Sequence, residues 1–174
     1  MSLDDPDFVR AEYASERGLL GRIAAYSAAN TEGPDAREAA FAAVAEVQPR
    51  RVLEVGCGTG WLSRRVADEL AADVVAIDQS ERMVELAREI GVDARVGAVE
   101  SLAFADGEFD LAVAAWMLYH VPDVDRALGE LARVLRPGGR LVAVTNGDDH
   151  LRELREGPLR ARRTPYVFVA ETAA

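Results

Sequence analysis

The sequence predicts an α/β fold in which helices cover a doubly wound, mostly parallel sheet. Two observations support this prediction. Short runs of Val, Ile, Leu and Ala alternate along the chain with amphipathic segments, as expected for strands that are buried on both faces. The first run, residues 51–55, leads directly into closely spaced glycines, and a helix is expected from about Trp61. This order of strand, glycine loop and helix is typical of the ligand-binding edge of an open parallel sheet.

The glycine loop is the first candidate site. Gly56, Gly58 and Gly60 let the backbone turn sharply and approach a ligand, because no Cβ stands in the way. The first N–H groups of the following helix lack intrahelical partners and favour an anionic group. The spacing G-x-G-x-G differs from the G-x-G-x-x-G of dinucleotide-binding folds. Cys57, the single cysteine, lies inside the loop and is expected to be a small apolar filler.

Glu54 stands two residues before the first glycine and extends the pattern to E-x-G-x-G-x-G. This pattern resembles motif I of the class I S-adenosylmethionine-dependent methyltransferases. The resemblance implies a Rossmann-like fold with S-adenosyl-L-methionine as its cofactor. It also implies that the methionine part of the cofactor meets Glu54, Gly56, Cys57, Gly58 and Gly60. Taken alone, the loop is also compatible with a tight turn that binds nothing.

Asp78 ends the second expected strand, residues 73–77, about 20 residues after the loop. A carboxylate at this place can accept hydrogen bonds from both ribose hydroxyls. The alternative is that Asp78 caps the next helix, for which Ser80 is the expected N-cap. The run from Asp78 to Met83 resembles the D-x-S-x-x-M pattern of the same family, which adds Gln79 and Met83 to the expected cofactor contacts.

The adenine side is expected after a short third strand, residues 94–96. Residues 97–104 are similar to the family pattern G-D-A-E-x-L-P-F, but Ala98 stands where the family has Asp. One hydrogen bond to the adenine is therefore expected to be absent, which weakens cofactor binding by about 1 kcal/mol. Backbone groups of Ala98 and Val99 are still expected to meet the adenine edge.

The fourth expected strand, residues 109–115, leads into a segment that resembles the L-x-H-x-x-D pattern of small-molecule methyltransferases. Ligands of parallel sheets sit outside the carboxyl ends of the strands, so Ala115 and His120 are expected to line the pocket. His120 is the candidate base, because an imidazole titrates near neutral pH. The alternative is that His120 only packs near the cofactor and transfers no proton.

The remaining elements complete a single domain over residues 1–174. Helices over residues 8–29 and 35–47 are expected to form an N-terminal lid within residues 1–50, with Tyr13, Arg17 and Tyr26 as its candidate contacts. A cofactor-binding core follows in residues 51–147. In that core a helical stripe from Val124 to Leu135 is followed by a stop and turn at Arg136 to Gly139 and by a fifth parallel strand at 140–145.

The C-terminal part, residues 148–174, is expected to be a shortened helix and strand. The helix is expected over residues 149–156. The last strand, at 166–170, resembles the final antiparallel strand of the family. The expected sheet thus has five parallel strands and one C-terminal antiparallel strand. Several tens of residues of the family pattern have no counterpart between this helix and this strand.

Composition limits the function classes. The chain has 174 residues, is 49% hydrophobic and carries a net charge of −10. This charge argues against nucleic acid as a partner. No run has the length of a membrane span, and no metal-ligand cluster is evident. We expect a cytoplasmic protein. We also expect it to be a monomer or a homodimer.

These observations lead to three functional hypotheses. The first is methyl transfer from S-adenosylmethionine to an unidentified small-molecule acceptor. The second is binding of S-adenosylmethionine without catalytic turnover. The third, a nucleotide-dependent oxidoreductase, is disfavoured by the glycine spacing.

Overall fold

The computed structural model describes most of the central part of the chain. The described residues are Asp5, Asp7, Ala11, Gly21, 36–145, 160–164 and 167–172. The expected lid contacts Tyr13, Arg17 and Tyr26 lie outside them, as does the helix expected over residues 149–156.

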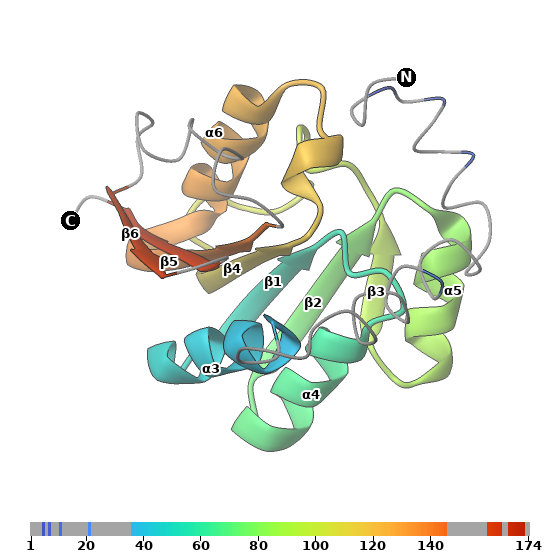
Figure 1. Ribbon diagram of the computed structural model, residues 1–174, viewed down its shortest axis with the longest axis horizontal. Helices are drawn as coiled ribbons and strands as arrows, with labels where there is room; N and C mark the ends of the chain where they lie inside the picture. Colours follow the sequence, from blue (N-terminus) through green and yellow to red (C-terminus); the bar gives the residue numbers. More distant parts are fainter. Residues whose placement is uncertain are drawn as a thin grey trace.

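A seven-stranded sheet forms the centre of the molecule, in the order β3-β2-β1-β4-β5-β7-β6 (Figure 1). Strands β1 to β5 run parallel, β7 pairs antiparallel with β5, and β6 pairs antiparallel with β7. The direction of winding reverses beside β1, where ligands of such sheets bind. The strands are β1 (Arg51–Val55), β2 (Asp73–Asp78), β3 (Asp93–Val96), β4 (Phe109–Ala115), β5 (Leu135–Val144), β6 (Arg160–Thr164) and β7 (Val167–Glu171).

Helices cover both faces of the sheet. On one face, α3 and α4 pack through Val44 and Leu62 in a cluster that includes Val113 of β4. On the other face, Leu128 and Leu131 of α6 share a buried cluster with strand residues of β1, β4 and β5. Helix α5 packs on Ala76 of β2 in a third cluster. The helices are α3 (Ala36–Val47), α4 (Trp61–Leu70), α5 (Glu81–Glu89), α6 (Val124–Val134) and the 3₁₀ turn η1 (Leu118–His120).

The predicted class is confirmed, with five parallel strands and an antiparallel C-terminal strand. The expected end of the helix is confirmed, since α6 ends at Val134, but the fifth strand begins at Leu135 and not at Arg140 as expected. Leu135 is buried and pairs with Phe109, and a bulge in the ladder between Phe109 and Leu111 accommodates the residues up to Arg140.

The sheet also has one strand more than expected. Strand β6 (Arg160–Thr164) lies between the helix and the last strand expected from the sequence, where no strand is expected. Its backbone groups pair with those of β7 from Arg160 to Thr164. These two strands form an antiparallel pair next to β5, so the sheet ends at β6 and not at β7.

Candidate functional site

The expected site residues come from the carboxyl ends of neighbouring parallel strands. Glu54 lies near the end of β1, Asp78 ends β2, and Ala115 ends β4. Gly97 follows β3, and its N–H donates a hydrogen bond to the carbonyl of Asp78 (3.0 Å). The sheet therefore brings the motif I loop, the acid of β2 and the start of the expected adenine segment to one edge.

The glycine loop needs glycine for two reasons. Gly56, Gly58 and Gly60 have φ values of +67°, +54° and +76°, in the left-handed region that side chains disfavour. The space beside two of them is also filled. A Cβ on Gly56 would lie 2.6 Å from Cβ of Met117, and one on Gly60 would lie 2.8 Å from Cβ of Ala87. The loop is thus packed against the β4–η1 segment and against α5.

Backbone hydrogen bonds tie this loop to the end of β2. The Cys57 N–H donates to the carbonyl of Ile77 (3.1 Å), and the Gly58 N–H donates to Oδ2 of Asp78 (2.9 Å). Oδ1 of Asp78 accepts from the N–H of Ser80 (2.9 Å). Asp78 is buried, and desolvation raises the pKa of its carboxyl, against the effect of these donors. Each carboxylate oxygen keeps further acceptor capacity, so these bonds are compatible with ribose binding.

Glu54 is a buried carboxylate whose hydrogen-bond partner is a hydroxyl. It is 4% exposed, and Oε2 accepts a hydrogen bond from Oγ of Ser63, which is 2% exposed. Burial raises the pKa of Glu54 to about 7, although the Ser63 hydroxyl and N–H lower it. A carboxylate in this position is poised to change its charge near neutral pH.

The Cys57 thiol is part of the core at this edge. Its side chain packs with Ala76 and Val84. Burial raises the pKa of the thiol and so favours its protonated form. The arrangement agrees with the expectation of a small apolar filler.

The residues after β2 and β3 divide into buried and exposed positions. Ser80 caps α5, since its hydroxyl accepts from the Met83 N–H (3.3 Å), as expected. Gln79 and Ala98 are exposed at the edge of the sheet. Met83 and Val99 are buried in the core, so in this structure their side chains support the edge from beneath.

Helix α6 holds the segment that follows Val99. The Arg133 guanidinium donates to the carbonyls of Leu102 (2.9 Å) and Phe104 (2.8 Å). Glu130 accepts from the Leu102 N–H (2.8 Å), and the neighbouring Arg133 guanidinium lowers the pKa of Glu130 to about 2. Arg126 donates to the carbonyl of Glu100 (2.8 Å). The backbone of the expected adenine segment is therefore fixed by side chains of one helix.

The segment after β4 holds His120 in the 3₁₀ turn η1. The imidazole is buried, and its ring centroid lies 4.4 Å from that of Tyr119. Before this turn, Trp116 has a φ of +55°, and its N–H donates to the carbonyl of Val144 (2.9 Å). A positive φ is uncommon for an aromatic residue and marks local backbone strain next to half-buried Ala115.

Sequence reasoning missed Ser63, and it expected Trp116 and Met117 only as part of the pocket-lining segment after the fourth strand. Ser63 carries a weak signal, because it interrupts the buried stripe of α4 with a hydroxyl between Leu62 and Val66. A polar group on a core-facing stripe predicts a buried hydrogen-bond partner. Neither the backbone strain at Trp116 nor the contact of Met117 with the glycine loop has a signal in residue type.

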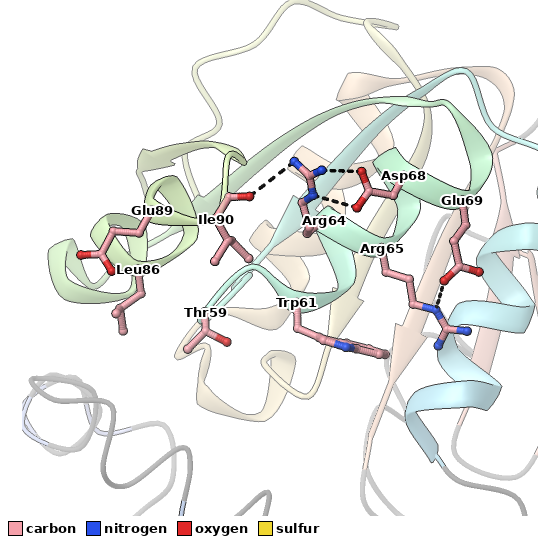
Figure 2. Close-up of a pocket in the computed structure, with 9 residues that line it drawn as sticks. All are labelled: Thr59, Trp61, Arg64, Arg65, Asp68, Glu69, Leu86, Glu89 and Ile90. Atoms are coloured by element: carbon pink, nitrogen blue, oxygen red, sulfur yellow. Dashed lines mark hydrogen bonds and ion pairs between the residues drawn. The ribbon is translucent and has the colours of Figure 1, made fainter.

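A separate shallow groove of about 540 Å³ lies between the outer sides of α4 and α5 (Figure 2). Its cations are already paired: Arg64 donates to Asp68 and to the carbonyl of Ile90, and Arg65 donates to Glu69 (Figure 2). Glu54 and Asp78 are not among its lining residues. The groove therefore borders the glycine loop at Thr59 without reaching the two candidate carboxylates.

Two further observations concern the described part of the chain. Within it, no group of three or more His, Cys, Asp or Glu side chains is arranged to hold a metal ion. None of the helices found there has the length and apolar character needed to cross a membrane.

Comparisons with known proteins agree with this geometry. The chain is 44% identical over 102 residues to a ubiquinone biosynthesis O-methyltransferase of Xanthomonas oryzae pv. oryzae, an alignment that covers 55% of this chain and 42% of that protein. It is 36% identical over 130 residues to a demethylmenaquinone methyltransferase of Renibacterium salmoninarum, with 74% and 52% covered. The chain thus spans about half the length of the curated relatives it matches.

A solved structure and a family model extend the comparison. The S-adenosylmethionine-dependent methyltransferase of Mesorhizobium loti superposes with a TM-score of 0.57 at 33% identity, over 64% of this chain and 54% of that one. A family model described as a methyltransferase domain matches residues 53–143, more than half of the chain. The chain therefore belongs to the methyltransferase domain family.

Proposed function

We propose that this chain binds S-adenosyl-L-methionine and transfers its methyl group to a small-molecule acceptor. The observation that carries the proposal is the buried Glu54 carboxylate beside a packed glycine loop, one strand away from Asp78. The two curated relatives named above are methyltransferases, and both of their names refer to quinone-type compounds. They support the reaction type and a small organic acceptor for this chain.

The residues at the edge fit the chemical groups of this cofactor. Glu54 orients the loop and faces the ammonium of the methionine part, since a buried carboxylate is stabilised by a neighbouring cation. Gly56, Cys57, Gly58 and Gly60 leave backbone N–H groups near the methionine carboxylate. The positive φ values and the lack of space for a Cβ support a role in close backbone approach.

The nucleoside part is assigned to the next two strands. Asp78 accepts hydrogen bonds from the ribose hydroxyls, with Gln79 beside it at the exposed end of β2. Ala98 and Val99 meet the adenine through their backbone, and the contacts from α6 keep that backbone in place. The proposed contacts of Met83 and Ala115 are through packing.

The cofactor supplies a methyl group that is activated by its sulfonium, and the chain's own residues orient the acceptor for in-line attack and exclude water. In such a transfer the acceptor would gain the methyl group and lose a proton, and a residue of the chain would have to accept that proton. We assign His120 as the group that takes this proton where the acceptor requires it. Its burial beside the end of β4 supports that role.

The proposed domain organisation follows the same division. Residues 51–147 form the cofactor-binding core, residues 1–50 form a lid, and residues 148–174 complete the single domain. We further propose a cytoplasmic enzyme that acts as a monomer or homodimer without nucleic-acid or membrane partners.

Calorimetric titration with S-adenosylmethionine and S-adenosylhomocysteine tests this function first. We expect both to bind in the micromolar range, which corresponds to about −8 kcal/mol. A radiolabelled methyl-transfer assay with phenolic and quinol acceptors then separates the alternatives. Binding without transfer to any acceptor supports the second hypothesis, a binding protein without turnover. Binding of NAD(H) by a folded chain that ignores both sulfur compounds would revive the oxidoreductase hypothesis.

A further inference from the structure

Ser63 and Glu54 form a buried pair that motif I does not include. The hydroxyl of Ser63, in the first turn of α4, donates to Oε2 of Glu54 in β1. Both residues are almost fully buried. The Ser63 N–H also acts on the Glu54 carboxylate. The start of α4 thus holds this carboxylate, whose two oxygens together keep further acceptor capacity for a ligand.

The charges around Glu54 do not favour its ionised form. The titratable groups that act on it or respond to it are Asp78 at the end of β2 and the Cys57 thiol of the loop. Asp78 raises the pKa of Glu54, and the buried thiol is neutral. The hydrogen bonds from Ser63 are the contribution that lowers this pKa. Loss of the hydroxyl therefore favours the protonated, neutral side chain.

We propose that Ser63 is a positioning residue that keeps the Glu54 carboxylate ionised and oriented, and that it thereby sets the pH dependence of cofactor binding. This inference rests on the proposed function, in which Glu54 faces the cofactor's ammonium. A cation binds the ionised carboxylate better than the neutral acid, so cofactor affinity rises with pH as Glu54 loses its proton. Without the Ser63 hydroxyl, this rise moves to higher pH.

The experiment measures the Kd of S-adenosylhomocysteine by calorimetry from about pH 5.5 to about pH 8.5, on either side of the Glu54 pKa. This probe carries the ammonium but no sulfonium. For the native chain we expect the affinity to rise with a midpoint near the Glu54 pKa of about 7. Ser63→Ala is expected to move the midpoint up by about one pH unit, the scale of one hydrogen bond. Its Kd is then about tenfold weaker at pH 6 and within about twofold at pH 8.5.

Three variants act as controls. Val66→Ala removes a buried side chain from the same helix, so it lowers the Tm and leaves the midpoint unchanged. Ser63→Thr retains the hydroxyl and is expected to restore the native midpoint. Glu54→Gln removes the titrating group, and its affinity is expected to be weak and independent of pH over this range.

Each outcome decides the matter. A Ser63→Ala variant that loses affinity equally at every pH overturns the inference, since Ser63 then has only a structural role. A native chain whose affinity does not change with pH also overturns it, while the proposed function stands. A folded native chain that fails to bind at any pH overturns the proposed function as well. If Ser63→Ala does not fold, Ser63→Cys provides a weaker donor of similar size, and an unchanged midpoint there contradicts the inference.

Discussion

Carboxylates lie in opposite environments at the two edges of the same parallel sheet. At the amino edge, the Arg51 guanidinium pairs with Glu108 (2.7 Å) and with Asp73, and Asp110 accepts backbone N–H groups of Arg50 (3.0 Å) and Arg51 (3.1 Å). These side chains are partly exposed, and the hydrogen bond from Arg51 lowers the pKa of Glu108. These charges lie near solvent, an opposite charge or backbone N–H groups.

At the carboxyl edge, burial raises the pKa of both Glu54 and Asp78. Among the described residues, the hydrogen-bond partners of these two side chains are a hydroxyl and backbone N–H groups. A buried carboxylate without a countercharge destabilises the folded chain when it is ionised. Ion pairs and solvent therefore favour ionised side chains at the amino edge, whereas burial disfavours ionised carboxyls at the carboxyl edge, which fits the proposed contact of Glu54 with a cationic ligand group.

The largest expected effect is at the glycine loop of the carboxyl edge. Gly56→Ala places a Cβ 2.6 Å from Cβ of Met117 at a φ of +67°. We expect the free energy of unfolding to fall by about 3 kcal/mol, from the left-handed backbone and the overpacking together. The sheet should stay folded, and affinity for S-adenosylhomocysteine should fall by more than about 100-fold because the loop must shift. Urea unfolding and calorimetry measure the two effects.

Gly138→Ala is the matched control for this change. Gly138 also has a positive φ of +73°, but a Cβ there would meet nothing within 4 Å. We expect only the backbone cost of about 1–2 kcal/mol and an unchanged Kd. Equal binding by Gly56→Ala and the native chain would contradict the motif I assignment.

The next largest expected effect is a dependence of folding stability on pH that Glu54 causes. The pKa of Glu54 is raised from 4.5 to about 7, so between these values the folded chain binds more protons than the unfolded chain. Stability of the ligand-free chain is therefore expected to fall as pH rises through this window, by about 3 kcal/mol in total. Glu54→Gln removes this loss of stability but adds the cost of burying an amide. The variant should therefore be more stable than the native chain at pH 8 by about 2 kcal/mol.

The measurement is urea unfolding of both chains at pH 5 and pH 8 without ligand. At pH 5 the native carboxyl is already largely protonated, so the gain from Glu54→Gln should vanish there. A variant that is less stable than the native chain at pH 8 would show that Glu54 stabilises the edge. The contrast between the two edges would then fail.

Much of the fold could be predicted from the sequence, and the exceptions have physical reasons. Apolar runs such as Val74 to Ile77 are buried on both faces of the sheet and leave little choice of structure. Leu135 continues the helical stripe of α6, so its apolar character suits either a helix or the start of β5. Strand β6 has no apolar pattern over Arg160 to Thr164, since its pairing depends on the backbone of β7.

The candidate site was partly predictable for the same kind of reason. Motif spacing and the parallel order of strands place Glu54 and Asp78 at one edge, because carboxyl ends of parallel strands meet there. The Ser63 hydrogen bond depends on how α4 is rotated over β1, which no local pattern specifies. The strain at Trp116 could not be predicted either, since aromatic residues rarely adopt a positive φ.

The smallest expected effect is at the amino edge. The Arg51 side chain is 41% exposed, and its partner Asp73 is 62% exposed, so water and salt screen the pair. Arg51→Ala is expected to lower the free energy of unfolding by less than about 1 kcal/mol, and by less still in high salt. Binding of S-adenosylhomocysteine should not change, because the ligand edge lies at the other ends of the strands. A loss of affinity in this variant would show that charges at the two edges are coupled through the sheet, and the division between a stabilising edge and a ligand-binding edge would then be too simple.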